Sequence, residues 1–64
     1  MTFGQKLRKA RIEKKVTQRF LAEKMHVSYQ TISKWENDIN EPNLAAIREL
    51  SKLLGCSIEY LISD

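Results

Sequence analysis

Apolar residues recur at helical spacing near the start of the chain. Phe3, Leu7 and Ala10 stand at positions i, i+4 and i+7. This spacing aligns apolar side chains on one face of a helix. We therefore predict a helix over residues 3–14, with Lys6 turned away from the apolar face.

Two short helices follow, and a hydroxyl residue precedes each. Thr17 comes before a run of good helix formers, which predicts a helix over residues 18–25, and Ser28 predicts another over residues 29–36. The side chain of an N-cap residue accepts a hydrogen bond from a backbone N–H that has no partner within the helix. Because only about residues 25–27 separate them, the two helices must cross steeply, as in a helix-turn-helix.

The main loop lies over residues 37–42, which are dense in turn formers and end in Pro42. Asn43 can cap a helix over residues 44–54, and Gly55 can end it in the left-handed conformation. The apolar positions of this helix are Leu44, Ile47, Leu50, Leu53 and Leu54.

A fifth helix is short. Ser57 can cap it, and it begins at Ile58. No segment alternates apolar and polar residues as a half-buried strand does. The predicted fold class is therefore all-α, a five-helix bundle, with a single domain over residues 1–64 and a helix-turn-helix at about residues 17–37.

Length and charge narrow the function. Sixty-four residues allow one compact core and no deep substrate chamber. The net charge of +3 conceals an asymmetry, because residues 1–32 carry eight Lys and Arg against two Glu, whereas residues 33–64 carry three basic against six acidic side chains. A basic half favours a polyanionic partner, although solvated helix faces produce the same count.

The single cysteine, Cys56, excludes an internal disulfide and favours a reducing compartment. No stretch approaches the roughly 20 apolar residues of a membrane span, and no apolar signal segment follows Met1. We expect a soluble cytoplasmic protein without a membrane partner.

Catalytic and metal chemistry have little support. The chain has one His and one Cys, no Gly-rich phosphate loop and no zinc-ligand spacing. We interpret His26 as a turn residue and Cys56 as a small buried apolar residue. Residues 36–41 are rich in oxygen but lack the central Gly of an EF-hand loop, and we interpret them as a solvated turn. We expect no enzyme activity, no metal and no cofactor.

The third predicted helix has a polar face opposite its apolar residues, and no carboxylate interrupts it. It carries amides, a hydroxyl and an amine, which are groups that hydrogen-bond to base edges in a major groove. The residues are Gln30, Ser33, Lys34 and Asn37, with Tyr29 at the rim. Taken alone, such a stripe is more often a solvated helix face.

The order of these features resembles a known family, the phage repressor and Cro-type helix-turn-helix proteins, also called the XRE family. The resemblance covers nearly the whole chain and implies a lambda-repressor-like helix-turn-helix domain that binds double-stranded DNA, encoded by a bacterium or phage and nucleoid-associated when bound. The matching residues are Gly4, Leu7, Arg11, Thr17, Gln18, Leu21, Ala22, Met25, Val27, Ser28, Thr31, Ile32, Ser33, Trp35, Glu36, Pro42, Asn43, Leu44, Leu53, Leu54, Gly55 and Leu61.

The resemblance also implies roles for particular residues. Gln18 contacts phosphate, the start and outer face of the third helix read bases, and Arg11 forms a structural ion pair with Glu36. Removing one partner of a largely buried pair typically costs about 3 to 5 kcal/mol. The expected DNA-binding residues are Gln18, Arg19, Ser28, Tyr29, Gln30, Thr31, Ser33, Lys34 and Asn37.

The chain departs from the family pattern in three places. His26 replaces the usual Gly of the turn, at a position that needs a left-handed backbone. The loop over residues 37–41 lacks the usual Gly and basic residue, which weakens phosphate contacts from it. Arg19 and Phe20 replace an acidic pair, and Arg19 brings a positive charge that can compensate for the acidic loop.

We therefore expect a sequence-specific transcriptional regulator, a repressor that binds a pseudo-palindromic operator as a homodimer through its C-terminal helix region. The alternative is a protein-binding module, or a DNA-binding antitoxin, whose main partner is another protein. Phe20 and an apolar patch of Ile58, Leu61 and Ile62 would serve such a partner, unless the patch closes the core.

Overall fold

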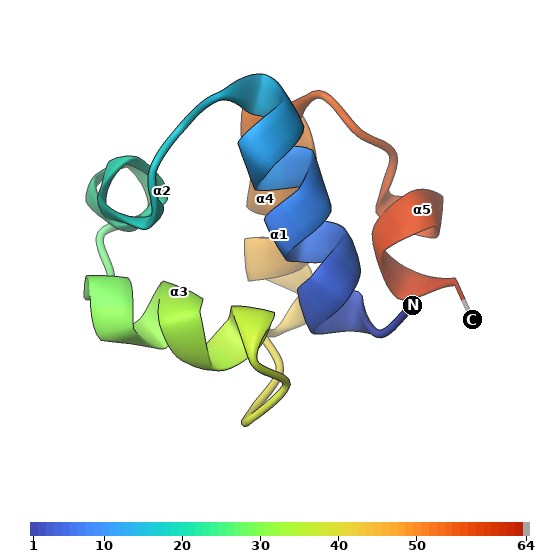
Figure 1. The fold of residues 1–64 in the computed structure, drawn as a ribbon, viewed down its shortest axis with the longest axis horizontal. Coiled ribbons are helices and arrows are strands. Elements are labelled where there is room, and N and C mark those ends of the chain that lie inside the picture. Colours follow the sequence, from blue (N-terminus) through green and yellow to red (C-terminus); the bar gives the residue numbers. More distant parts are fainter. Residues whose placement is uncertain (64) are drawn as a thin grey trace.

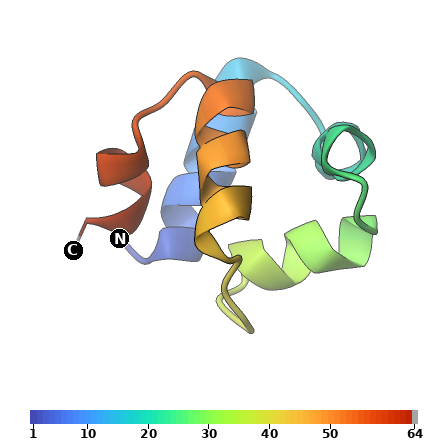
Figure 2. The same cartoon turned by 180° about the vertical axis from the view of Figure 1, so that it is seen from behind.

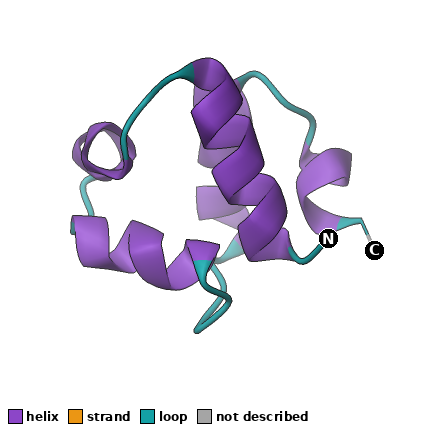
Figure 3. Ribbon diagram, in the orientation of Figure 1, coloured by secondary structure: helices purple, strands orange, loops and turns teal. Residues whose placement is uncertain are grey.

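Residues 1–63 are described in the computed structural model, and within them the chain forms helices and no strand (Figure 3). This confirms the all-α fold class, and the helix bounds agree with those predicted. The helices are α1 (Phe3–Lys14), α2 (Gln18–Met25), α3 (Tyr29–Glu36), α4 (Leu44–Leu54) and α5 (Ile58–Ile62).

Side-chain caps explain why the helices begin where they do. The four predicted N-caps are confirmed, since each accepts a hydrogen bond from the backbone N–H three residues further on: Thr17, Ser28, Asn43 and Ser57. The cap of α1 was not predicted. Thr2 accepts from the backbone N–H of Gln5 at 3.1 Å, and the Gln5 side chain accepts from the backbone N–H of Thr2 at 2.9 Å, which makes a reciprocal capping box.

The helix-turn-helix lies on one side of the bundle. In Figure 1, α1 and α4 occupy the centre, α2 and α3 lie to one side, and α5 lies to the other. Figure 2 shows the same arrangement from behind, with α4 in front. In both views α2 is seen end-on while α3 lies across the page, so the predicted steep crossing is confirmed.

Each helix contributes one aliphatic side chain to the centre of the core. Leu7, Leu21, Ile32, Leu50 and Leu61 come from α1 to α5 in that order, and none is more than 1% exposed. Full burial of one such side chain is worth about 1.5 to 3 kcal/mol. No helix can therefore leave the bundle without exposing a core residue.

The apolar patch expected at the C-terminal helix is divided between core and surface. Leu61 is buried in the core, whereas Ile62 is 55% exposed and Ile58 is half-buried. Leu44 was predicted on the apolar face of α4 but is 54% exposed. Burial increases along α4 towards Leu50, because the first turn of this helix lies outside the core.

The prediction that Lys6 turns away from the core is wrong. Lys6 is only 6% exposed, and its ammonium donates to the backbone oxygen of Ser63 and to its hydroxyl, the latter at 3.1 Å. The same nitrogen lies 5.8 Å from the centre of the Tyr60 ring. Packing of α5 against α1 brings these partners to the amine, so a buried cation is satisfied.

The loop after α3 is not simply a solvated turn. Asp38 adopts a left-handed backbone, φ 58°, and its carboxylate accepts from the backbone N–H of Gly4 at 2.8 Å and from the Thr2 hydroxyl at 2.5 Å. A negative charge is favourable at the N-terminus of a helix. At Gly4 a Cβ atom would come within 2.4 Å of the Glu36 backbone oxygen, so only glycine lets α1 approach the end of α3 this closely.

His26 ends α2 with a left-handed backbone, φ 58°, which confirms the prediction for the turn. We expect His26→Gly to leave the fold unchanged and to alter the free energy of unfolding only modestly, because relief of about 1 to 2 kcal/mol of strain is partly offset by the unfolded-state entropy of glycine. His26→Val should be clearly less stable, since a β-branched side chain disfavours this conformation. Urea denaturation of the three proteins measures both effects. Equal stability of His26→Val and the parent would contradict the strain argument.

Candidate nucleic-acid interface

A buried carboxylate joins the three helices that build the candidate interface. The side chain of Glu36, at the end of α3, is only 2% exposed. It accepts from Arg11 of α1, with Nε to Oε2 at 2.6 Å and Nη2 to Oε1 at 3.2 Å. Arg11 also donates to the backbone oxygen of Val16 at 3.0 Å. The pair expected from the sequence is thus brought together by two hydrogen bonds, and the guanidinium also holds the connection that leads into α2.

Gln18 lies in this network, which the sequence did not predict. It is half-buried, and its Nε2 donates to Oε1 of Glu36 at 3.1 Å. Gln18 is the first residue of α2, so the bond fixes the start of α2 against the end of α3. Its amide nitrogen is therefore engaged within the protein, and its amide oxygen makes no hydrogen bond within residues 1–63.

The outer face of α3 presents two exposed side chains that nothing in the protein holds. Gln30 and Lys34 are exposed, and within residues 1–63 no hydrogen bond or ion pair engages either of them. Their amide and amine are therefore available to a ligand, as hydrogen-bond donors and, for Gln30, an acceptor.

Four other expected site residues form hydrogen bonds at the two ends of α3. Ser28 caps α3 by accepting from the backbone N–H of Thr31 at 3.2 Å, and the two hydroxyl oxygens lie 3.0 Å apart. At the other end of the helix, the side-chain amide of Asn37 donates to the backbone oxygen of Ser33 at 2.8 Å. Ser28 and Asn37 are thus the two caps of α3, and their hydrogen bonds stabilise both ends of the helix.

Arg19 and Tyr29 are in contact, which the sequence did not predict. The guanidinium carbon of Arg19 lies 4.2 Å from the centre of the Tyr29 ring, and the tyrosine is 38% exposed. The two residues stand on different helices, so no helical spacing relates them. Only the crossing of α2 and α3 brings them together.

Two of the basic residues counted in the first half of the chain are used internally. Arg11 neutralises Glu36, and Lys6 is bound at the C-terminal end of the described chain. Arg19, Lys24 and Lys34 remain exposed on the two helices of the helix-turn-helix. The positive charge available at the interface is therefore smaller than the count suggests.

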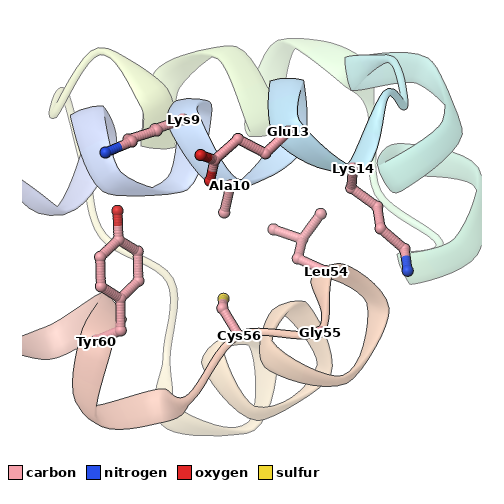
Figure 4. Close-up of a pocket in the computed structure, with 8 residues that line it drawn as sticks. All are labelled: Lys9, Ala10, Glu13, Lys14, Leu54, Gly55, Cys56 and Tyr60. Carbon is pink, nitrogen blue, oxygen red and sulfur yellow. The ribbon is translucent and has the colours of Figure 1, made fainter.

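A surface hollow lies away from α3, between α1 and the α4–α5 turn (Figure 4). It measures about 340 Å³, and Figure 4 shows the Cys56 sulfur directed into it below Ala10. Burial raises the pKa of the Cys56 thiol, against a smaller lowering by a backbone hydrogen bond. The thiol is therefore protonated at neutral pH and is a poor nucleophile.

Residues 1–63 hold neither a cluster of metal ligands nor a helix that could span a membrane. No three His, Cys, Asp or Glu side chains in this range gather as metal ligands would. None of its helices combines the length and the apolar character that crossing a membrane requires.

The chain is similar to known helix-turn-helix proteins, several of which are transcriptional regulators. A Helix-turn-helix family profile matches residues 7–61. The HTH-type transcriptional activator BcrR of Enterococcus faecalis is 40% identical over 63 residues, which cover 98% of this chain and 31% of that protein. Repressor protein C2 of Salmonella phage P22 is 39% identical over 59 residues, which cover 92% of this chain and 27% of that protein.

A solved structure is similar over the same range. The P22 c2 repressor protein, in complex with synthetic operator 9T in the presence of Tl+, superposes with a TM-score of 0.91 at 36% identity, and the match covers 98% of this chain and 96% of that one. The chain spans only between 27% and 56% of the length of the curated relatives that it matches.

The Glu36 network generates a stability prediction. We expect Glu36→Ala to lower the free energy of unfolding by about 3 to 5 kcal/mol, because it leaves the Arg11 charge poorly solvated and without its partner. Glu36→Gln should lose less, since an amide oxygen can still accept from Arg11. Urea denaturation measures both, and Glu13→Ala, an exposed position on α1, is the matched control with an expected change within about 0.5 kcal/mol. A Glu36→Ala loss no larger than the control would show that the carboxylate does not join the helices.

Proposed function

Because the chain belongs to the phage repressor and Cro-type (XRE) helix-turn-helix family, we propose that it binds a specific sequence in double-stranded DNA and regulates transcription as a repressor. In this proposal it is a cytoplasmic binding protein and not an enzyme. The observation that carries the proposal is the outer face of α3, where Gln30 and Lys34 are exposed and without partners in residues 1–63. The DNA-bound state of the similar P22 c2 repressor supports it.

In this proposal α2 and α3 contact different parts of the DNA. α3 enters the major groove, where Gln30 can pair with adenine through two hydrogen bonds and Lys34 can reach guanine. The start of α2 faces the phosphate backbone, where a helix N-terminus and the Arg19 charge both favour an anion. Phosphate contacts supply affinity and orientation, and base contacts supply the choice of sequence.

The remaining expected site residues support α3 in this proposal. Ser28 caps its start by accepting from the Thr31 N–H, and Asn37 caps its end by donating to the Ser33 backbone oxygen. The ends of a helix lying in the groove pass close to the phosphate strands, so these residues can add contacts to the DNA backbone.

The experiment that tests the proposal is selection of duplexes from a random pool, followed by binding measurements on variants. We expect Gln30→Ala to weaken binding to the selected duplex by about 1 to 3 kcal/mol, with little effect on a scrambled duplex, and to relax selection at one base pair. Lys34→Ala should behave similarly, and Lys52→Ala, which removes an exposed lysine at the end of α4, is its matched control.

Arg19→Ala should instead weaken binding to both duplexes equally, and it should reduce the slope of log affinity against log salt concentration by about one. Unchanged affinity and preference in Gln30→Ala and Lys34→Ala would reject base reading by α3.

We further propose that two copies bind one pseudo-palindromic operator, through contacts near the C-terminal helix. Ile62 is 55% exposed there, beside the half-buried Ile58, and a second copy would cover both. We expect footprints over two half-sites about 34 to 36 Å apart, and a complex mass of two chains for each duplex. A one-to-one complex at saturation, with a single asymmetric half-site, would contradict the dimer.

The second candidate function is binding to another protein, and one observation favours it. Phe20 is 38% exposed on α2, with the Lys24 ammonium 5.6 Å from its ring centre. Leu61 no longer counts towards this candidate because it is buried in the core. If Phe20→Ala abolishes regulation of transcription while Gln30→Ala and Lys34→Ala do not, the protein-binding function replaces the repressor.

A further inference from the structure

The contact between Arg19 and Tyr29 joins the two helices at their N-terminal ends. Arg19 is the second residue of α2, and Tyr29 is the first residue of α3. The guanidinium lies 4.2 Å from the ring centre, well within the roughly 6 Å over which a cation is attracted to an aromatic face. Both side chains are exposed, so the contact lies on the surface and not in the core.

The position of Arg19 is unfavourable for the helix that carries it. A cation in the first turn opposes the helix dipole, and α2 has no acidic residue in that turn to offset it. The same place is favourable for a bound phosphate, which a helix N-terminus and a guanidinium both attract. The Tyr29 ring attracts the guanidinium from the neighbouring helix and so holds it at this place before any ligand arrives.

A stacked guanidinium keeps its capacity to bind phosphate. Its five N–H donors spread outward from the central carbon, so contact with a ring on one side leaves donors on the other side available to a phosphate. The guanidinium covers one face of the Tyr29 ring, so a thymine methyl group cannot pack on that face.

We propose that Tyr29 is a positioning residue that holds Arg19 in place for a phosphate contact, and that it does not read bases. The proposal rests on the proposed function, since it names the part that each of these two residues takes in binding duplex DNA. It has a specific consequence. Tyr29 affects binding only through Arg19, so its effect must disappear when Arg19 is removed.

The test is a double-mutant cycle on DNA affinity. Arg19→Ala, Tyr29→Leu, the double variant and the parent are titrated with the duplex selected from a random pool and with a scrambled duplex, at several salt concentrations. We expect Tyr29→Leu to weaken both duplexes equally, by about two- to fivefold, which is the strength of an exposed cation–π contact. In the Arg19→Ala background we expect the same substitution to change affinity less than 1.5-fold, about the precision of such titrations.

Two control variants and a fold check accompany the cycle. Tyr29→Phe keeps the ring without the hydroxyl. It should retain the parent's affinity, its preference for the selected duplex and its dependence on salt concentration. Lys24→Ala removes the other cation–π contact of α2, which is made with Phe20. Its effect on affinity should be the same with and without Tyr29→Leu. Thermal unfolding of every variant verifies that the differences arise in folded protein.

Three results would overturn the proposal. A change of preferred base pair in Tyr29→Leu would make Tyr29 a base reader, and an equal loss with and without Arg19 would make the two residues independent. Loss of binding in Tyr29→Phe would assign the role to the hydroxyl. Failure of the proposed function looks different, because the parent would then bind selected and scrambled duplexes equally, whereas the coupling between Tyr29 and Arg19 is measured on either duplex.

Discussion

The carboxylate of Glu36 is the constraint on which the rest of this structure depends. It belongs to α3, accepts two hydrogen bonds from Arg11 of α1 and accepts a third from Gln18 of α2. A charge with 2% of its side chain exposed is tolerable only if each lone pair facing the interior finds a donor. The three helices must therefore meet in one arrangement, and that arrangement directs the opposite face of α3 towards solvent.

Close backbone packing reinforces this constraint at the C-terminal end of α3. Gly4 lets the start of α1 approach the Glu36 backbone, and Asp38 accepts from the Gly4 N–H at 2.8 Å immediately beyond the helix. The end of α3 is thus held by a side-chain network and by a cap on α1. The directional hydrogen bonds that fix how the helices meet are concentrated at the end of α3. The five aliphatic side chains at the centre of the core supply hydrophobic stabilisation, which is not directional.

The distribution of charge follows from the same packing. Lys6 and Arg11 satisfy acceptors inside the bundle, so the basic first half of the chain offers a ligand less charge than its count implies. At the helix-turn-helix the exposed cations are few, and Arg19 stands at the start of α2 where the helix dipole adds to its effect on an anion. In the acidic loop, the carboxylate of Asp38 is held by the start of α1 through the Thr2 hydroxyl and the Gly4 N–H.

The sequence by itself determined the five helices, four of their N-caps and the left-handed turn at His26, because each depends on residues within a few positions along the chain. It also indicated the outer face of α3, since helical spacing alone separates that face from Ile32 and Trp35. The tertiary structure decided the rest. Lys6 with Ser63, Asp38 with Gly4 and Gln18 with Glu36 are pairs separated by 57, 34 and 18 residues, and Arg19 meets Tyr29 only where two helices cross. Such contacts leave no periodic signal, because the partner of each polar group is chosen by the packing of whole helices and not by its neighbours in the chain.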